Sequence, residues 1–343
     1  MDIAAQVDMT VPPPPARPRV PLPQVPWPRF PLAVLPTPLV RAHRLEAALR
    51  CGPLLLKRDD LAGFAAAGNK TRPLEYLLGA ALAEGCDVLV TGGGPGSNFC
   101  PAAALAARAA GLDCELVVWG DITAAPNIAL AAAAGARLHR TGDDRRDAVD
   151  AAVEDRAAAL ASQGRRPYPV PRGGSTAVGA AGFAVAAAEL VAQLDGPPAF
   201  VALAVGSGGS CAGLLAGLAV TGQEWPVLGI SVSRPPAEIS SRIAELAQQC
   251  ASALGAAAPR LDLLEIVDGR GPGFGVAAEA DRDRGRLALH TEGLLLDDTY
   301  GAKAFAATAD RLPRRESRPV VYWHTGGLIP AVAALDSATR GAA

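Results

Sequence analysis

Short apolar runs alternate with segments of helical periodicity along most of the chain. In the first half, the runs at 53–60, 87–91 and 114–119 have the length and apolar content of buried strands. Between them, residues 71–83 and 102–110 carry apolar side chains at helical spacing, and a glycine follows each segment closely. Strands that alternate with helices at this spacing predict an α/β protein with a mainly parallel sheet.

The same alternation returns in the second half of the chain. The pattern predicts a helix over 177–194 and strands over 199–205, 227–232 and 319–323. Glycine-rich turns follow the first and the last of these strands, as they do the strand at 87–91. We therefore expect two α/β lobes, each with an open, mainly parallel sheet. Ligands of such sheets bind beyond the carboxyl ends of the strands, in a crevice.

The proline-rich arm at 1–34 stands apart from this pattern. Prolines continue to position 38, and a stretch of this composition cannot form a helix. We expect a mobile arm of polyproline type that is disordered as a tail; the alternative is an arm that lies across a partner subunit.

Composition and charge narrow the class of protein. The 343 residues suffice for two domains, half of them are apolar, and the net charge is −2. This balance favours neither nucleic acid nor an anionic membrane as a partner, and no long uncharged apolar run predicts a membrane span. The six scattered cysteines form no C-x-x-C pair, the four histidines lack metal-ligand spacing, and no secretory signal is recognisable. We expect a cytoplasmic protein without a metal.

Three segments combine glycine with groups that suit a small anionic ligand. Residues 206–210, Gly-Ser-Gly-Gly-Ser, lie between a strand and a helix, where converging N–H groups form a phosphate cradle. Residues 91–98 form a similar turn, in which Ser97 and Asn98 add donors for a carboxylate. Lys70 lies at the first turn of a predicted helix and would act as a Schiff-base nucleophile if its pKa were lowered. Each segment taken alone also fits an ordinary turn or a solvated lysine.

These segments belong to a longer series of motifs that resembles one protein family. The series consists of Leu35-Pro-Thr-Pro-Leu39, Leu56-Lys-Arg-Asp-Asp-Leu61, Gly68-Asn-Lys-Thr-Arg72, Gly93 to Asn98, Gly173-Gly-Ser175, Gly206 to Ser210, Ser231-Val-Ser-Arg234 and His324-Thr-Gly-Gly327. From about residue 34 to 335 the chain resembles the D-cysteine desulfhydrase and 1-aminocyclopropane-1-carboxylate (ACC) deaminase family. Members are pyridoxal-phosphate (PLP) enzymes of the tryptophan-synthase-β fold type.

The resemblance implies a domain organisation as well as a cofactor. It places a large PLP-binding domain at 35–65 plus 176–343 and a small α/β domain at 66–175, with the active site in the cleft between them. It also implies a homodimer that acts on a small amino acid.

The resemblance further assigns roles to individual residues. Lys70 matches the lysine that carries PLP, and Asn69 matches a residue near the cofactor's 3-oxygen. Thr325 matches a hydroxyl that faces the pyridine nitrogen, and Tyr300 matches a tyrosine that positions substrate or moves a proton. The turn with Ser97 and Asn98 matches the loop that binds the substrate carboxylate, and Ser97 also handles protons there. The residues that match the phosphate cradle are Gly206, Ser207, Gly208, Gly209 and Ser210.

The chain departs from the family pattern on the substrate side. Gly96 replaces a glutamine found in many members, Phe99 replaces a histidine or glutamine, and Phe274 replaces a second active-site tyrosine. Gly301 stands where ACC deaminases have an acid. We therefore expect Phe99 and Phe274 to line an altered, more apolar substrate pocket.

The predicted activity is that of a PLP-dependent lyase or deaminase. We expect Schiff-base exchange on Lys70 and β-elimination from a small amino acid, as in D-cysteine desulfhydrase, with a substrate more apolar than D-cysteine or ACC. The alternatives are a β-replacement enzyme or other PLP lyase that uses an unusual amino acid, an ACC deaminase, and a PLP-binding protein without turnover. The sequence leaves the substrate and its chirality open.

Overall fold

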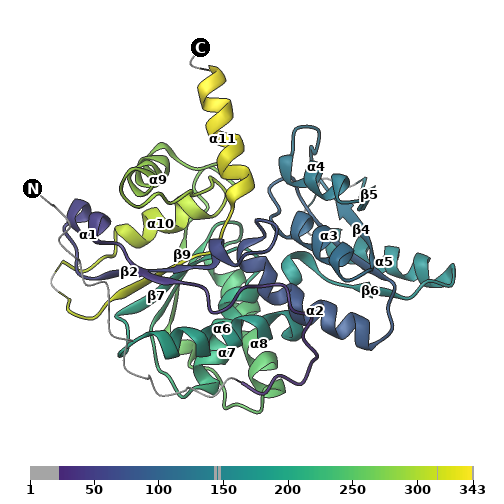
Figure 1. Ribbon diagram of the computed structural model, residues 1–343, viewed down its shortest axis with the longest axis horizontal. Coiled ribbons are helices and arrows are strands. Elements are labelled where there is room, and N and C mark those ends of the chain that lie inside the picture. Colours follow the sequence, from purple (N-terminus) through teal and green to yellow (C-terminus); the bar gives the residue numbers. More distant parts are fainter. Residues whose placement is uncertain (1–22, 143–144, 146–147, 315, 342–343) are drawn as a thin grey trace, which may run out of the picture.

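The computed structural model describes residues 23–142, 145, 148–314 and 316–341. Within them the chain forms two lobes, each built on an open sheet with helices around it (Figure 1). A six-stranded sheet has the order β1-β2-β10-β7-β8-β9, in which only β1 pairs in antiparallel fashion. A four-stranded sheet has the order β5-β4-β3-β6 and is parallel throughout. The predicted fold class is confirmed.

The strands and helices have the following bounds. The larger sheet contains β1 (Leu39–Arg41), β2 (Leu54–Arg58), β7 (Phe200–Val205), β8 (Val227–Ser231), β9 (Leu264–Asp268) and β10 (Val320–His324). The smaller sheet contains β3 (Val88–Gly93), β4 (Asp113–Val118), β5 (Arg137–Arg140) and β6 (Pro167–Pro169). The helices are α1 (His43–Leu49), α2 (Thr71–Ala83), α3 (Phe99–Ala109), α4 (Pro126–Ala133), α5 (Ala148–Ser162), α6 (Ala177–Gln193), α7 (Gly209–Val220), α8 (Pro236–Ala253), α9 (Glu279–Glu292), α10 (Gly301–Ala309) and α11 (Leu328–Gly341).

These elements match the predicted ones closely. Helix α2 covers the residues predicted for it, and most strand ends shift by one or two residues, as boundaries commonly do. Helix α3 begins three residues earlier than predicted, at Phe99, because Pro101 falls in its first turn, where a missing N–H costs no hydrogen bond. All strands of the smaller sheet lie between residues 88 and 169. On that basis we propose the domain boundaries expected from the sequence, 66–175 for the small lobe.

The abundance of alanine and glycine has a packing explanation in the larger lobe. Helices α6 and α7 lie against each other almost backbone to backbone. A Cβ atom at Gly213 or Gly217 would collide with the carbonyl oxygen of Ala180 or Ala184 on the facing helix. Small residues on both helices therefore allow the close approach, and the core beneath is filled by larger side chains such as the fully buried Trp323.

The prediction of a disordered arm does not hold for residues 23–34. This segment crosses from the larger lobe, where Trp27 packs, to the smaller lobe, where Phe30 and Leu32 pack (Figure 1). The buried carboxylate of Glu75 on α2 fixes it. That carboxylate accepts two bonds from Arg29, at 2.8 and 2.9 Å, and one from the backbone N–H of Leu32 at 2.7 Å. A proline-rich chain has few hydrogen bonds of its own, so it can lie on a surface that supplies the acceptors. Residues 1–22 lie outside the described part.

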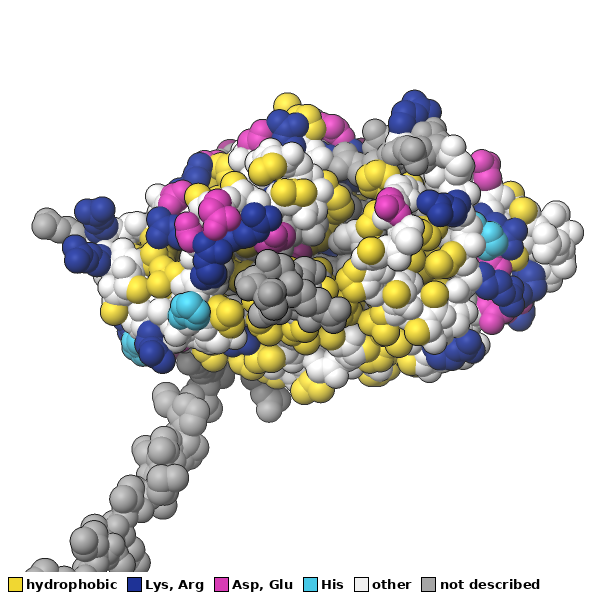
Figure 2. Space-filling view, turned by 90° about the horizontal axis from the view of Figure 1, so that it is seen from above, with side chains coloured by type: hydrophobic (Ala, Val, Ile, Leu, Met, Phe, Trp, Pro, Cys, Tyr) yellow, Lys and Arg dark blue, Asp and Glu magenta, His cyan; other side chains and the backbone are white. Residues whose placement is uncertain are grey.

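The surface carries charges of both signs. On the face shown in Figure 2, Lys and Arg side chains lie among Asp and Glu side chains with uncharged surface between them. Among the described residues, no helix is long and apolar enough to cross a membrane.

Candidate active site

The residues singled out from distant parts of the sequence line one cleft, to which both lobes contribute. The predicted residues that line it are Asn69, Lys70, Ser97, Asn98, Phe99, Gly206, Ser207, Gly208, Gly209, Ser210, Phe274, Tyr300 and Thr325. The turns after β3, β7 and β10 bring most of them together, because the carboxyl ends of parallel strands meet at one edge of a sheet. Trp119, Arg172, Ser233 and Arg234 also line the cleft, and none of these four was assigned a role from the sequence.

Lys70 is held at the cleft by a short turn that packs against the backbone of Thr325, the residue after β10. It ends a short 3-10 turn, Gly68–Lys70, that leads into α2. Gly68 has a left-handed φ of +56°, and a Cβ there would collide with the carbonyl oxygen of Thr325. The N–H of Asn69 donates to that same oxygen at 2.9 Å. The positions of Lys70 and of the Thr325 turn are therefore coupled.

The amine of Lys70 differs from the other amines of the chain. The sequence contains three lysines, Lys57, Lys70 and Lys303. The ammonium group of Lys57 is paired with Glu189, and that of Lys303 donates to two backbone carbonyls. Burial lowers the pKa of Lys70 to about 8. Lys70 is thus the lysine of this cleft whose amine can become neutral and nucleophilic near physiological pH.

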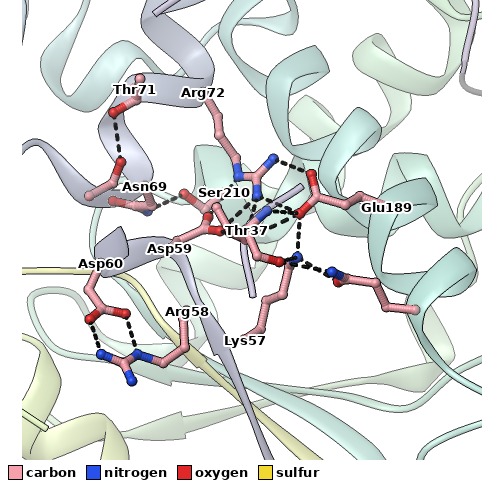
Figure 3. Close-up of polar contacts among 12 residues, drawn as sticks. Thr37, Lys57, Arg58, Asp59, Asp60, Asn69, Thr71, Arg72, Glu189 and Ser210 are labelled. Atoms are coloured by element: carbon pink, nitrogen blue, oxygen red, sulfur yellow. Dashed lines mark hydrogen bonds and ion pairs between the residues drawn. The ribbon is translucent and has the colours of Figure 1, made fainter. Parts of the chain in front are cut away.

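A buried ionic network anchors the helix that begins after Lys70. The guanidinium of Arg72 donates to both carboxylate oxygens of Asp59, each at 2.8 Å, and to Glu189 on α6 (Figure 3). Lys57 and Thr37 complete the cluster by bonding to Glu189. Burial disfavours the charged form of Asp59, yet Arg72 outweighs it and holds the pKa of Asp59 below its usual value. The network ties α2 to β2 and α6, so it fixes the start of the Lys70 helix.

The predicted phosphate cradle has the shape of an anion site. It lies between β7 and α7, and Gly208 precedes the helix with a left-handed φ of +95°. Helix α7 has no side-chain cap, and among the described residues the first of its leading N–H groups with an acceptor is that of Ala212. Those free N–H groups and the helix dipole favour a bound anion.

Hydroxyl and amide groups surround this cradle. Ser175 donates to the Oγ of Ser207 at 2.7 Å, and the amide of Asn69 donates to the Oγ of Ser210 at 3.0 Å. A Cβ at Gly209 would come within 2.9 Å of Ser175 Oγ, so glycine is needed for the close approach. Ser175 belongs to the motif Gly173-Gly-Ser175, whose pattern alone predicts no role for its hydroxyl.

The turn at 93–98 is ordered by contacts within the smaller lobe. The Oγ of Ser97 accepts the N–H of Cys100 at 3.3 Å, and the side-chain oxygen of Asn98 accepts from the amide of Asn127 on α4 at 2.9 Å. Asn127 is buried and was not identified from the sequence. These bonds orient Ser97 and Asn98 at the N-terminus of α3, where a carboxylate is favoured.

The two phenylalanines of the predicted pocket differ in position. Phe99 borders the cleft, but its side chain is only 2% exposed and packs beside Gly174 in the core of the smaller lobe. The role of Phe99 toward the substrate stays a prediction. Phe274 lies edge-on to Tyr300, with ring centroids 5.9 Å apart, and a Cβ at Gly96 would be 3.5 Å from its ring. Its phenyl ring borders the cleft as predicted.

A buried carboxylate that the sequence analysis missed orients Tyr300. Asp297 accepts the N–H groups of Thr299 and Tyr300 at 3.1 Å and of Gly301 at 2.9 Å, in the turn that begins α10. A Cβ at Gly327 would meet the Oδ1 of Asp297 at 2.5 Å, so the same carboxyl also abuts the turn after Thr325. Burial raises the pKa of Asp297 to about 6, although the three N–H bonds act in the opposite direction.

This raised pKa predicts a pH-dependent contribution to stability. A carboxyl whose pKa rises from 3.8 to about 6 on folding stabilises the fold below pH 4 and loses that contribution as the pH rises through 6. The free energy of unfolding of the natural protein, relative to Asp297→Asn, should fall by at most about 3 kcal/mol between pH 4 and pH 7. Urea denaturation of both proteins across this range measures it, and a constant or rising difference would contradict the assignment.

Comparison with known proteins agrees with this geometry. Residues 31–326 match the family described as "Pyridoxal-phosphate dependent enzyme". The chain belongs to this PLP enzyme family. It is 35% identical over 314 residues to a D-cysteine desulfhydrase of Salmonella typhi, and the alignment covers 88% of this chain and 94% of that protein. It is 34% identical over 310 residues to a putative ACC deaminase of Pyrococcus abyssi, with 88% and 92% covered.

A solved structure shows the same relationship. The crystal structure of an ACC deaminase homologue superposes on this chain with a TM-score of 0.85 at 30% identity, and covers 92% of this chain and 96% of the other. This PLP enzyme is therefore a lyase similar to D-cysteine desulfhydrase and ACC deaminase, and PLP is its cofactor, as the motifs predicted.

The residues present fit the cofactor. PLP needs an amine for its aldehyde, donors for its phosphate and a partner for its ring nitrogen. The cleft offers Lys70, the uncapped start of α7 with its glycines, and Thr325. Arg172 and Arg234 also line it, each paired with a carboxylate outside it (Asp150 and Glu238), whereas no aspartate or glutamate lines it among the described residues. Such a lining suits an anionic cofactor and a substrate carboxylate.

Proposed function

We propose that this PLP enzyme catalyses β-elimination from a small amino acid whose side chain is more apolar than that of D-cysteine or ACC. With one water consumed, the products would be the protonated leaving group, a 2-oxo acid and ammonia. The observation that carries the proposal is the phenyl ring of Phe274, edge-on to Tyr300 and beside Gly96 at the cleft. In the family pattern that the sequence resembles, Phe274 replaces a tyrosine and Gly96 replaces a glutamine found in many members, so that pattern would present polar groups at both positions.

Individual residues of the cleft would have separate roles in the reaction. PLP, when bound, withdraws electrons from the substrate Cα, and that chemistry belongs to the cofactor. The Lys70 amine, with a pKa lowered to about 8 by burial, takes the Cα proton as a general base. The N–H groups of the turn around Ser97 and Asn98 bind the substrate carboxylate. Tyr300, oriented by Asp297, donates or accepts a proton at the leaving group.

Thr325 would set how strongly the cofactor withdraws electrons. Its hydroxyl is a neutral partner for the ring nitrogen, and among the described residues no carboxylate lines the cleft to protonate that nitrogen. A neutral ring withdraws electrons less, which suits elimination, where a leaving group departs from Cβ. ACC has no Cα proton, so its ring opening makes greater demands, and the acid that ACC deaminases carry after the tyrosine is Gly301 here.

The pocket wall would select the substrate side chain. A phenyl ring gains from apolar contact, worth on the order of 25 cal/mol for each Å² removed from water. It also leaves a polar group of the substrate unpaired, which costs roughly 1–3 kcal/mol. Both effects favour a thioether or another apolar leaving group over a free thiol.

A leaving-group series tests this proposal. We expect kcat/KM for S-alkyl and S-aryl cysteines to exceed that for D-cysteine and ACC by roughly tenfold or more. The Phe274→Tyr variant should narrow this difference, because the added hydroxyl offers a partner to polar substrates. The assay measures 2-oxo acid and ammonia from the D- and L-forms of each cysteine derivative and from ACC, which is achiral.

Three outcomes count against the proposal. Turnover of D-cysteine or ACC at rates above the thioethers would contradict the apolar selectivity. A series that Phe274→Tyr leaves untouched would remove Phe274 from the pocket wall. A substituted amino acid, formed in place of the 2-oxo acid when a thiol nucleophile is added, would show a β-replacement enzyme instead.

A further inference from the structure

The loop that carries Phe274 has little structure of its own. Residues 269–276 read Gly-Arg-Gly-Pro-Gly-Phe-Gly-Val, and Gly271, Gly273 and Gly275 have left-handed φ values of +54°, +146° and +87°. Its own bonds are two turn contacts, from the N–H of Gly273 to the carbonyl of Arg270 at 3.1 Å and from the N–H of Val276 to the carbonyl of Gly273 at 3.3 Å, besides an isolated bridge between Gly273 and Val276. Glycine loses the most conformational freedom on ordering, so such a loop keeps one shape only if something outside it supplies the contacts.

Lys303 supplies those contacts from helix α10. Its ammonium group donates to the backbone carbonyls of Arg270 and Gly273, each at 2.6 Å. The side chain is buried, with 2% of the residue exposed, and no ion pair to a carboxylate holds it within the described part of the chain. Burial lowers the pKa of Lys303, against the attraction of Asp281 and Asp298. A buried ammonium is costly, and short charge-assisted bonds to two carbonyls are what offset that cost here.

The same helix connects Lys303 to the site. Tyr300 precedes the first turn of α10, three residues before Lys303, so the tyrosine and the loop contact share one rigid element. Phe274, next to the bonded Gly273, packs edge-on against the Tyr300 ring. Lys303 thus connects α10 to the loop, and Phe274 of the loop contacts Tyr300 at the start of the same helix.

The loop also lines two hollows. One is the active-site cleft. The other is lined by Val232, Ser233, Asp268, Arg270, Gly271, Gly273 and Phe274. Ser233 and Phe274 border both hollows. A displacement of residues 269–276 would therefore change the width of the substrate pocket.

We propose that Lys303 is a positioning residue, which latches loop 269–276 against Tyr300 and so sets the wall of the substrate pocket. Its role toward substrate rests on the proposed function, whereas its role in ordering the loop does not. Loss of the latch should loosen the loop and weaken substrate binding more than it slows the chemical step, because Lys303 touches no reacting group.

The test compares the PLP-loaded natural enzyme with Lys303→Met, which keeps the length and apolar stem but lacks the donors. Hydrogen exchange at amides 269–276 should rise about tenfold or more, as expected for lost bonds to a charged donor, while exchange in β8 stays unchanged. With D-cysteine as the probe, KM should rise by a similar factor and kcat should change less. The visible absorbance of PLP on Lys70 should be unaffected.

Two further variants separate the latch from its neighbours. Phe274→Leu removes the ring but keeps the latch, so it should alter KM without raising exchange in the loop. Lys303→Gln retains a neutral donor and should give exchange between that of the natural enzyme and Lys303→Met. Unchanged exchange in Lys303→Met, or a uniform rise throughout the protein, would overturn the proposal. If the natural enzyme released no 2-oxo acid from D-cysteine, from ACC or from the thioethers, the proposed function would need revision, while the exchange result would still decide the latch.

Discussion

Replacement of Lys70 by alanine is expected to lower the turnover rate by at least about 10³-fold and to abolish the visible absorbance of covalently held PLP. The expectation follows from the small number of amines available. Of the three lysines in the chain, Lys57 and Lys303 have buried ammonium groups committed to Glu189 and to backbone carbonyls. Neither can reach the cofactor without breaking the contacts that hold it.

The fold should survive this change. Lys70 has no ion pair to lose in the described part of the chain, and removal of a buried amine relieves a desolvation cost. Activity toward a panel of amino acids, absorbance spectra with added PLP, and circular dichroism together make the measurement. A Lys70→Ala protein that still formed a covalent PLP adduct reducible by borohydride would rule out the assignment.

Replacement of Arg72 by methionine is expected to lower the free energy of unfolding by about 3–5 kcal/mol. The change leaves the carboxylates of Asp59 and Glu189 buried without the guanidinium that pairs them. Because Arg72 lies two residues after Lys70, the start of α2 should also shift. We therefore expect weaker PLP retention and slower turnover at temperatures where the variant is still folded.

A surface arginine serves as the matched control for Arg72. Arg260 also pairs with two carboxylates, Asp262 and Glu224, but about half of its side chain is exposed. Arg260→Met should leave both the urea midpoint and the PLP content unchanged, because solvent screens exposed pairs. Equal effects of the two substitutions would show that the buried network does not stabilise the fold.

The elements and the residues lining the cleft could be predicted because their signals are local. The periodicity of Thr71–Ala83 identified α2 to the residue. The glycine turns at 93–98 and 206–210 lie where strands end, and parallel sheets bring such ends to one edge. Lys70 gained its meaning only from the series of motifs around it, since one lysine at a helix start is ordinarily solvated.

The groups that hold the site in place could not be predicted because their partners are distant in sequence. Glu189 lies 117 residues after Arg72, and Lys303 reaches a carbonyl 33 residues before it. Charged residues within apolar helices were a signal, since α2, which is buried from Thr71 to Ala81, tolerates Arg72 and Glu75 only when both are paired. The packing of the Phe99 ring could not be predicted for the same reason: Gly174, which makes room for the ring, lies 75 residues away along the chain.

The measurement that tests the central claim most directly is the location of the covalent cofactor. The purified PLP-loaded enzyme is reduced with borohydride and digested, and the peptides are mapped by mass spectrometry. With three lysines in the chain, the assignment is unambiguous. We predict a pyridoxyl group on the peptide that contains Lys70 and unmodified peptides for Lys57 and Lys303. Stoichiometric label on either of those two, with Lys70 unmodified, would contradict the account.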